Sequence, residues 1–172
     1  ILLGGDNMDL ALAHVVAAKL AGQGTRLEPW QVRALTQGCC AAKETLLSDA
    51  EAESARVVVP SRGSKLIGGS LGTELTRLEV TAPILEGFFP TVEVSARPVT
   101  RARAGLTQIG LPYAQDAAVT RHLAAFLQRQ LQTAAEIPGL EKALPSGATF
   151  VHPTAVLFNG GVFKSDLLIE RI

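Results

Sequence analysis

The apolar positions in the first 50 residues predict two long amphipathic helices. Apolar residues recur every four positions from Met8 to Leu20, which is the spacing of one helix face. Asp6 precedes this run and is expected to be the N-cap, and Gly22 is expected to end the helix.

The second helix is predicted to begin at Pro29, because proline suits the first helical turn, and to end at Ser48 and Asp49. Its apolar residues alternate steps of three and four, which predicts one buried stripe over about four turns. The members of this stripe are Val32, Leu35, Cys39, Ala42 and Leu46.

The middle of the chain predicts short strands and one short helix. Residues 55–59 form a β-branched run that a proline ends, and residues 73–80 alternate between polar and apolar side chains. The glycine- and serine-rich residues 61–72 between them are expected to hold turns, with a short strand around Leu66 and Ile67. Thr81 is expected to cap a helix starting near Pro83.

The last part of the chain predicts another helix, a buried strand and a closing helix. Asp116 is expected to cap a helix that runs through Leu131, and the apolar residues 154–158 predict a buried strand. A turn at 159–161 follows, and Ser165 is expected to cap the closing helix. Residues 90–112 are harder to interpret, and Val92, Val94, Leu106 and Ile109 indicate strands or extended segments.

Because helices and strands mix throughout, the predicted class is α/β or α+β. The chain has 172 residues, of which 47% are hydrophobic, so it can build the core of one domain or two small subdomains. Its sixteen acidic and sixteen basic residues cancel, so no general attraction to nucleic acid or to an anionic membrane is expected. No segment has the length and hydrophobicity of a membrane helix or the pattern of a signal peptide.

The two cysteines, Cys39 and Cys40, are adjacent in a predicted helix, where neighbouring side chains diverge by about 100°. A disulfide framework is therefore not expected, and a reducing cytoplasm fits. A reactive or metal-binding cysteine stays open as an alternative, although no histidine lies near the pair in the sequence.

Two features are candidates for ligand binding. Gly160 and Gly161 lie between a predicted strand and a predicted helix, where a backbone can approach a ligand closely, although a tight turn between the two elements is the commoner explanation. Lys43, Glu44 and Leu47 share a helix face with Cys40, beside the buried stripe. This face borders either a ligand cleft or solvent.

Four segments together resemble the DnaK, or heat shock 70 kDa, chaperone family, in its divergent bacterial branch. Residues 3–9 (LGGDNMD) and 39–48 (CCAAKETLLS) are similar to the family's LGG-(D/E)-(D/N)-(F/M)-D segment and its CE-x-AK-x-x-LS helix. Residues 80–81 and 156–161 (VLFNGG) resemble its ITR segment and its adenosine loop. The four segments occur in the family's order over nearly the whole chain.

The resemblance implies lobe II of an actin-like ATPase domain, a ribonuclease H-like fold with an inner and a peripheral subdomain. Residues 1–27 and 112–172 would form the inner subdomain. Residues 28–111 would form the peripheral subdomain, with an insertion around 91–111. Both ends of the chain look cut, so we expect an interior piece of a longer protein.

The resemblance also implies a site for ATP or ADP with Mg²⁺ between two lobes, to which this chain contributes the adenosine side. Gly4 and Gly5 are expected near the phosphates. The other positions that the resemblance assigns to nucleotide binding are Lys43, Glu44, Leu47, Gly160, Gly161 and Lys164.

Several positions depart from the family's pattern. Cys40 replaces the usual acid, Glu44 stands where a base that stacks on adenine is common, and Leu47 replaces a hydroxyl. Val162 and Lys164 replace the common Ser and Arg, and lysine lacks the planar group that stacks. Adenine recognition is therefore expected to be weaker or altered.

The implied function is the nucleotide-binding lobe of a cytoplasmic, DnaK-like chaperone ATPase. Its expected partners are the other lobe, and client proteins or co-chaperones, with no nucleic acid and no membrane. The chain lacks the family's phosphate loops and catalytic carboxylates, so ATP turnover is expected of the parent protein and not of this chain alone. The alternatives are a nucleotide-independent scaffold or protein-interaction module with the same fold, and a lobe of a sugar- or acetate-kinase type.

Overall fold

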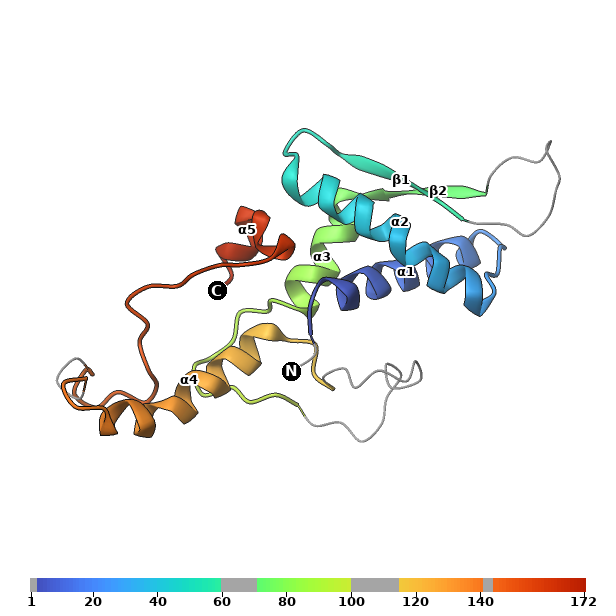
Figure 1. Cartoon of the computed structure of the whole chain (residues 1–172). Helices are drawn as coiled ribbons and strands as arrows, with labels where there is room; N and C mark the ends of the chain where they lie inside the picture. The colour runs from blue at the N-terminus through green and yellow to red at the C-terminus, as the bar shows by residue number, and fades with distance from the viewer. Residues whose placement is uncertain (1–2, 60–70, 100–114, 141–143) are drawn as a thin grey trace.

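The computed structural model describes residues 3–59, 71–99, 115–140 and 144–172. These residues form a mixed helix and strand fold, broadly α+β, in which a two-stranded antiparallel ribbon packs with helices (Figure 1). Figure 1 shows α4 lying apart from the pair formed by α1 and α2. In chain order the elements are α1 (Gly5–Gly22), α2 (Pro29–Ser48), β1 (Ser54–Val58), β2 (Gly72–Thr76), α3 (Arg77–Gly87), α4 (Val119–Glu136), the 3₁₀ turn η2 (Gly161–Lys164) and α5 (Asp166–Ile169).

Helix α1 ends at Gly22 as predicted, but its N-cap is Gly4 and not Asp6. The Asn7 side chain accepts a hydrogen bond from the Gly4 amide at 2.9 Å, which closes the first turn two residues earlier than Asp6 as the cap would. Asp6 lies exposed within the first turn, where its negative charge interacts favourably with the helix dipole and stabilises α1.

Helix α2 begins at Pro29 and ends at Ser48, which confirms the prediction at both ends. Four of the five residues of its predicted stripe are buried, and Val32 is partly buried. This stripe packs into one core with the apolar face of α1, with the inward side of the ribbon and with the buried residues of α3. The core members on α1, the ribbon and α3 include Met8, Leu12, Val16, Leu20, Val57, Leu75, Val80 and Ile84.

The ribbon is shorter than predicted, and the helix after it begins earlier. Strand β1 pairs with β2 in the register that joins Ser54 to Thr76 and Val58 to Gly72. The predicted strand over 73–80 is wrong beyond Thr76, because α3 begins at Arg77, and Thr81 and Pro83 lie inside this helix. The expected strand around Leu66 and Ile67 lies outside the described residues.

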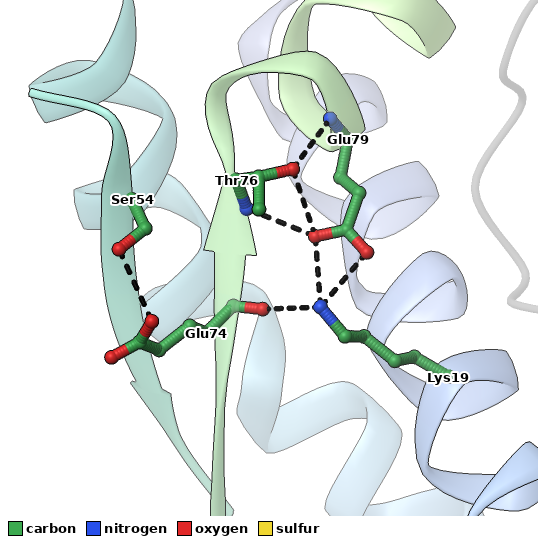
Figure 2. A network of polar contacts seen from close by, with 5 residues as sticks. All are labelled: Lys19, Ser54, Glu74, Thr76 and Glu79. Carbon is green, nitrogen blue, oxygen red and sulfur yellow. Dashed lines mark hydrogen bonds and ion pairs between the residues drawn. The ribbon is translucent and has the colours of Figure 1, made fainter.

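A capping box explains why the strand gives way to a helix at this point. The Thr76 hydroxyl accepts a hydrogen bond from the Glu79 amide at 3.3 Å, and the Glu79 carboxylate accepts one from the Thr76 amide at 2.9 Å. Lys19 of α1 reaches the same carboxylate at 2.8 Å and donates to the Glu74 carbonyl at 2.7 Å (Figure 2). These contacts join α1, β2 and α3 at one point.

We predict that Glu79 makes stability depend on pH. Burial acts to raise the pKa of Glu79, but hydrogen bonds from Lys19 and Thr76 outweigh it, so the pKa lies below its usual value. A lowered pKa stabilises the folded protein above the unfolded-state pKa, and this contribution is lost as the pH falls through the folded-state pKa. In urea titrations, Glu79→Gln should therefore lower the free energy of unfolding by about 0.5–1 kcal/mol at pH 7.

The difference between the wild type and Glu79→Gln should shrink as the pH falls through the acidic range. Glu93→Gln changes an exposed glutamate outside this network and serves as the control. A difference that stays constant from neutral to strongly acidic pH contradicts the linkage.

Helix α4 begins at Val119, and Asp116 lies before the cap residue Ala118 and not at the cap. Asp116 is nevertheless buried, and its carboxylate accepts hydrogen bonds from the amides of Val99 at 2.7 Å and Ala118 at 2.9 Å. Burial acts to raise the pKa of Asp116, but these hydrogen bonds and Arg121 lower it overall. Asp116 thus links the backbone at Val99 to the residues that precede α4.

The predicted buried strand over 154–158 is wrong. This segment has no strand partner among the described residues, and Leu157 is 93% exposed. Of the segments expected around 90–112, residues 90–99 are described and contain no strand, and Leu106 and Ile109 lie outside the described residues. Within the part of the chain that the structure describes, no helix is both long and apolar enough to cross a membrane.

Candidate functional site

A cavity of about 160 Å³ lies between α2 and the C-terminal segment that holds η2 and α5. Its lining is mostly apolar but includes the buried Lys43 and Ser165, and Glu44 and Lys164 are exposed. Its lining residues are Met8 from α1, then Lys43, Glu44, Leu47 and Ser48 from α2, and Gly161, Val162, Lys164, Ser165 and Leu168 from the C-terminal segment.

Helix α2 supplies the first wall because its residues next to the buried stripe face the cavity. Lys43, Glu44 and Leu47 lie at positions i, i+1 and i+4, so one helix surface presents all three. Glu44 is exposed, Leu47 is half-buried, and Lys43 is buried. This wall therefore combines an apolar surface with a carboxylate at the solvent edge.

Lys43 forms a buried ion pair with Asp9 of α1. Its Nζ lies 2.6 Å from Asp9 Oδ1, and the two side chains are 7% and 5% exposed. Among the described residues, Asp9 Oδ1 makes this ion pair but no hydrogen bond of good geometry. Nζ also donates to the Gly5 carbonyl at 3.4 Å. The positive charge of Lys43 is thus largely neutralised within the protein.

The second wall depends on a turn that only glycine adopts easily. Gly160 has a φ of 100°, which other residues rarely adopt, and η2 follows it directly. Phe163 of η2 packs edge-on against Phe89 with ring centroids 6.1 Å apart, and its ring lies 5.2 Å from that of Phe158. The aromatic contacts and the fully buried Leu168 anchor this wall to the core.

Ser165 occupies the N-cap position of α5, but its side chain does not cap the helix. The residue is 3% exposed and lines the cavity, and Oγ is buried without a hydrogen-bond partner among the described residues. The expectation that Ser165 caps the closing helix is therefore correct for its position and wrong for its hydroxyl. A buried hydroxyl without a partner is costly and uncommon.

The structure brings five of the eight expected site residues to this cavity, namely Lys43, Glu44, Leu47, Gly161 and Lys164. Gly160 does not line the cavity but forms the turn that precedes its second wall. Gly4 and Gly5 lie at the start of α1, also outside the lining. A Cβ on Gly5 would lie 3.3 Å from Lys43 Nζ and 3.5 Å from Val162 Cγ2, so Gly5 lets both walls approach α1.

Both cysteines are free, as expected. Burial and, after it, the negative charge of Asp9 raise the pKa of the Cys39 thiol to about 12. Burial and then Asp9 also raise the pKa of Cys40, whose Sγ lies 3.8 Å from Glu44 Oε1. Such thiols are poor nucleophiles near neutral pH. No group of three or more potential ligand side chains that could hold a metal occurs within the described ranges.

Sequence reasoning missed Asp9 and the hydroxyl of Ser165. The signal for Asp9 is its spacing, because Asp9, Ala13, Val16 and Leu20 recur at helical intervals and all are buried. A carboxylate on an apolar helix face indicates a buried partner. No sequence signal distinguishes a serine whose hydroxyl caps a helix from one whose hydroxyl makes no hydrogen bond.

This arrangement suits binding of a flat molecule that has both an apolar surface and polar edges. The apolar lining residues, among them Met8 and Leu168, can cover a ring, and Glu44, Ser48 and Lys164 are exposed. Comparison of the chain with protein families, with curated proteins and with solved structures finds no match.

Proposed function

We propose that this chain is the lobe of a DnaK-like chaperone ATPase that contributes the adenosine side of an ATP site. The observation that carries the proposal is the shared cavity. Lys43, Glu44 and Leu47 come from one helix, Gly161 and Lys164 come from a turn far along the chain, and the same cavity is lined by all five. The resemblance assigns these same five residues to one nucleotide site.

The size of the cavity supports a site that is completed by another part of the parent protein. Complete sites for small molecules occupy about 300–1,000 Å³, whereas this cavity measures about 160 Å³. A second lobe closing over the rim would enlarge and enclose it, as in hinge closure around a ligand. On this proposal residues 1–27 and 112–172 form the inner subdomain, and residues 28–111 form the peripheral subdomain of an actin-like fold.

The charges favour the nucleoside end of ATP over its phosphates. Lys43 is neutralised by Asp9, and Glu44 adds a negative charge at the rim that repels phosphate. Lys164 is the exposed cation of the lining. The phosphates and Mg²⁺ are accordingly assigned to the lobe outside this chain, and the protein to the cytoplasm with clients or co-chaperones as partners.

The second candidate is a scaffold or protein-interaction module that retains this fold without binding nucleotide. Two observations favour it. Glu44 offers no planar cation to stack on adenine, and the charge of Lys43 is already paired. The two candidates differ in one measurable property, which is adenosine binding at the cavity.

The test is a titration of the ¹⁵N-labelled chain with adenosine, followed by amide chemical shifts. Adenosine should shift the amides of both walls, in residues 43–48 and 161–165. Glu44→Arg should tighten binding about three- to tenfold, because a guanidinium can stack on the base. Glu44→Gln removes the charge without adding a planar cation, and it should change the affinity less.

Two outcomes of this titration would contradict the proposal. If adenosine shifts neither wall in the wild type or in Glu44→Arg, the adenosine site is absent and the scaffold is favoured. Shifts confined to one wall also contradict the proposal, because the ligand must contact α2 and η2 together.

A further inference from the structure

We propose that Glu44 is a specificity-determining residue of the cavity and that its carboxylate accepts a hydrogen bond from the amino group of the bound adenine. This inference rests on the proposed function, because it names the group by which that site recognises its base. Glu44 is exposed and lines the cavity, so a molecule that enters the cavity can reach its side chain.

Glu44 lies within the surface of α2 that lines the cavity and not at the border of that surface. Successive residues of a helix are rotated by about 100°, so Glu44 projects between the directions of Leu47 and Ser48, and both of these residues also line the cavity. Leu47 is apolar and half-buried. One wall therefore places an apolar surface that can cover a ring beside a carboxylate that can meet the edge of the ring.

The carboxylate of Glu44 is available to a ligand. Among the described residues it forms no ion pair, and its one hydrogen-bond contact is with the thiol of Cys40, a weak donor whose Sγ lies 3.8 Å from Oε1. The neighbouring polar side chains of this wall are already engaged. Lys43 pairs with Asp9, and the Ser48 hydroxyl donates to the main-chain carbonyl of Glu44 at 2.6 Å.

A carboxylate can only accept hydrogen bonds, so it meets a donor of the ligand. The amino group is the donor of the adenine base, whereas the ring nitrogens accept. The second wall carries Lys164, which is exposed and makes no ion pair within the part of the chain that the structure describes. These two unpaired charges of opposite sign orient an adenine nucleotide with its amino end toward Glu44 and its sugar and phosphate end toward Lys164.

The consequence is selectivity between ligands that differ at one group. Purine riboside is adenosine with a hydrogen atom in place of the amino group, so it cannot make the hydrogen bond to Glu44. The wild type should bind adenosine about fivefold more tightly than purine riboside, because a hydrogen bond to a charged group contributes less where solvent reaches it than where it is buried.

The test measures the affinities of the ¹⁵N-labelled chain for adenosine and for purine riboside from amide chemical shifts. Glu44→Ala should bind the two ligands equally, and Glu44→Gln should retain part of the preference because its amide oxygen still accepts. Glu44→Arg has only donors, so it should lose the preference even though stacking raises its affinity for both ligands. The control Glu51→Ala alters an exposed glutamate that does not line the cavity, and it should keep the wild-type preference.

Two further probes separate the amino group from the sugar, because ribose hydroxyls are also donors. The affinities for 2′-deoxyadenosine and 3′-deoxyadenosine, each relative to adenosine, should be the same in the wild type and in Glu44→Ala. If removing a hydroxyl weakens binding to the wild type but not to Glu44→Ala, the carboxylate meets the ribose and the inference is overturned.

The inference is also overturned by a wild type that binds adenosine and purine riboside equally, or by a Glu44→Ala variant that keeps the preference. Both of these results leave the adenosine site standing. The absence of adenosine binding to the wild type removes the proposed function together with this inference.

Discussion

Replacing Asp9 by asparagine is expected to lower the free energy of unfolding by about 3–5 kcal/mol, the typical cost of leaving one partner of a buried ion pair uncompensated. Asp9 lies 2.6 Å from Lys43 Nζ, and both side chains are at least nine-tenths buried. An asparagine amide and the Gly5 carbonyl at 3.4 Å can still accept from the ammonium group, but neither supplies the negative charge that compensates it. Urea denaturation followed by circular dichroism measures the loss.

A double-mutant cycle separates this ion pair from a general effect on α1. Asp9→Leu and Lys43→Met should each destabilise the protein, and the double variant Asp9→Leu/Lys43→Met should recover much of the combined loss, because neither charge is then buried alone. Asp6→Asn changes an exposed acid on the same helix and should cost less than about 1 kcal/mol. Strictly additive effects of the two single changes would show that the pair is not coupled.

The second large effect is expected at Arg77, the first residue of α3. Its guanidinium donates to the carbonyls of Leu46 at 2.5 Å and Ala52 at 2.5 Å, and also to the carbonyl of Asp49. These carbonyls lie at the end of α2 and in the connection to β1, where helix geometry leaves acceptors without partners. Arg77→Ala should therefore lower the free energy of unfolding by about 2–3 kcal/mol.

The planar fork of Arg77 is what allows one side chain to serve several carbonyls. Arg77→Lys keeps the charge but loses this geometry, so it should give an intermediate loss. Arg33→Ala changes an exposed arginine of α2 and should stay within about 0.5 kcal/mol of the wild type in the same urea titration. Equal stability of Arg77→Ala and Arg33→Ala would contradict the bridging role.

The sequence predicted the first two helices well because their signals are local. These signals are a stripe of apolar residues with period 3.6, a proline in the first turn of α2 and a glycine at the end of α1, and each acts within a few residues along the chain. Helices α1 and α2 end at the predicted Gly22 and Ser48. The failure at residues 77–80 is instructive, since the sequence there also carries a local signal. Thr76 and Glu79 have the spacing of a capping box, which outweighs the alternation of the apolar residues.

The candidate site was predictable only in part. The resemblance and the helix spacing together placed Lys43, Glu44 and Leu47 on one surface, but their meeting with Gly161 and Lys164 depends on how distant segments pack. The run over 154–158 illustrates the limit. Its composition favours a strand, yet a strand requires a neighbour to pair with, and Leu157 is 93% exposed without one in the described structure.

By itself, the sequence determined which surfaces of α1 and α2 are apolar, where α2 begins and where both helices end, because those properties depend on residues within a few turns of one another. Only the tertiary structure decided that Asp9 pairs with Lys43, that Arg77 reaches the end of α2, and that the hydroxyl of Ser165 is buried without a partner among the described residues. The physical reason is that a hydrogen bond or ion pair requires two atoms to meet within about 3 Å. Which distant atoms meet is set by the packing of the whole core.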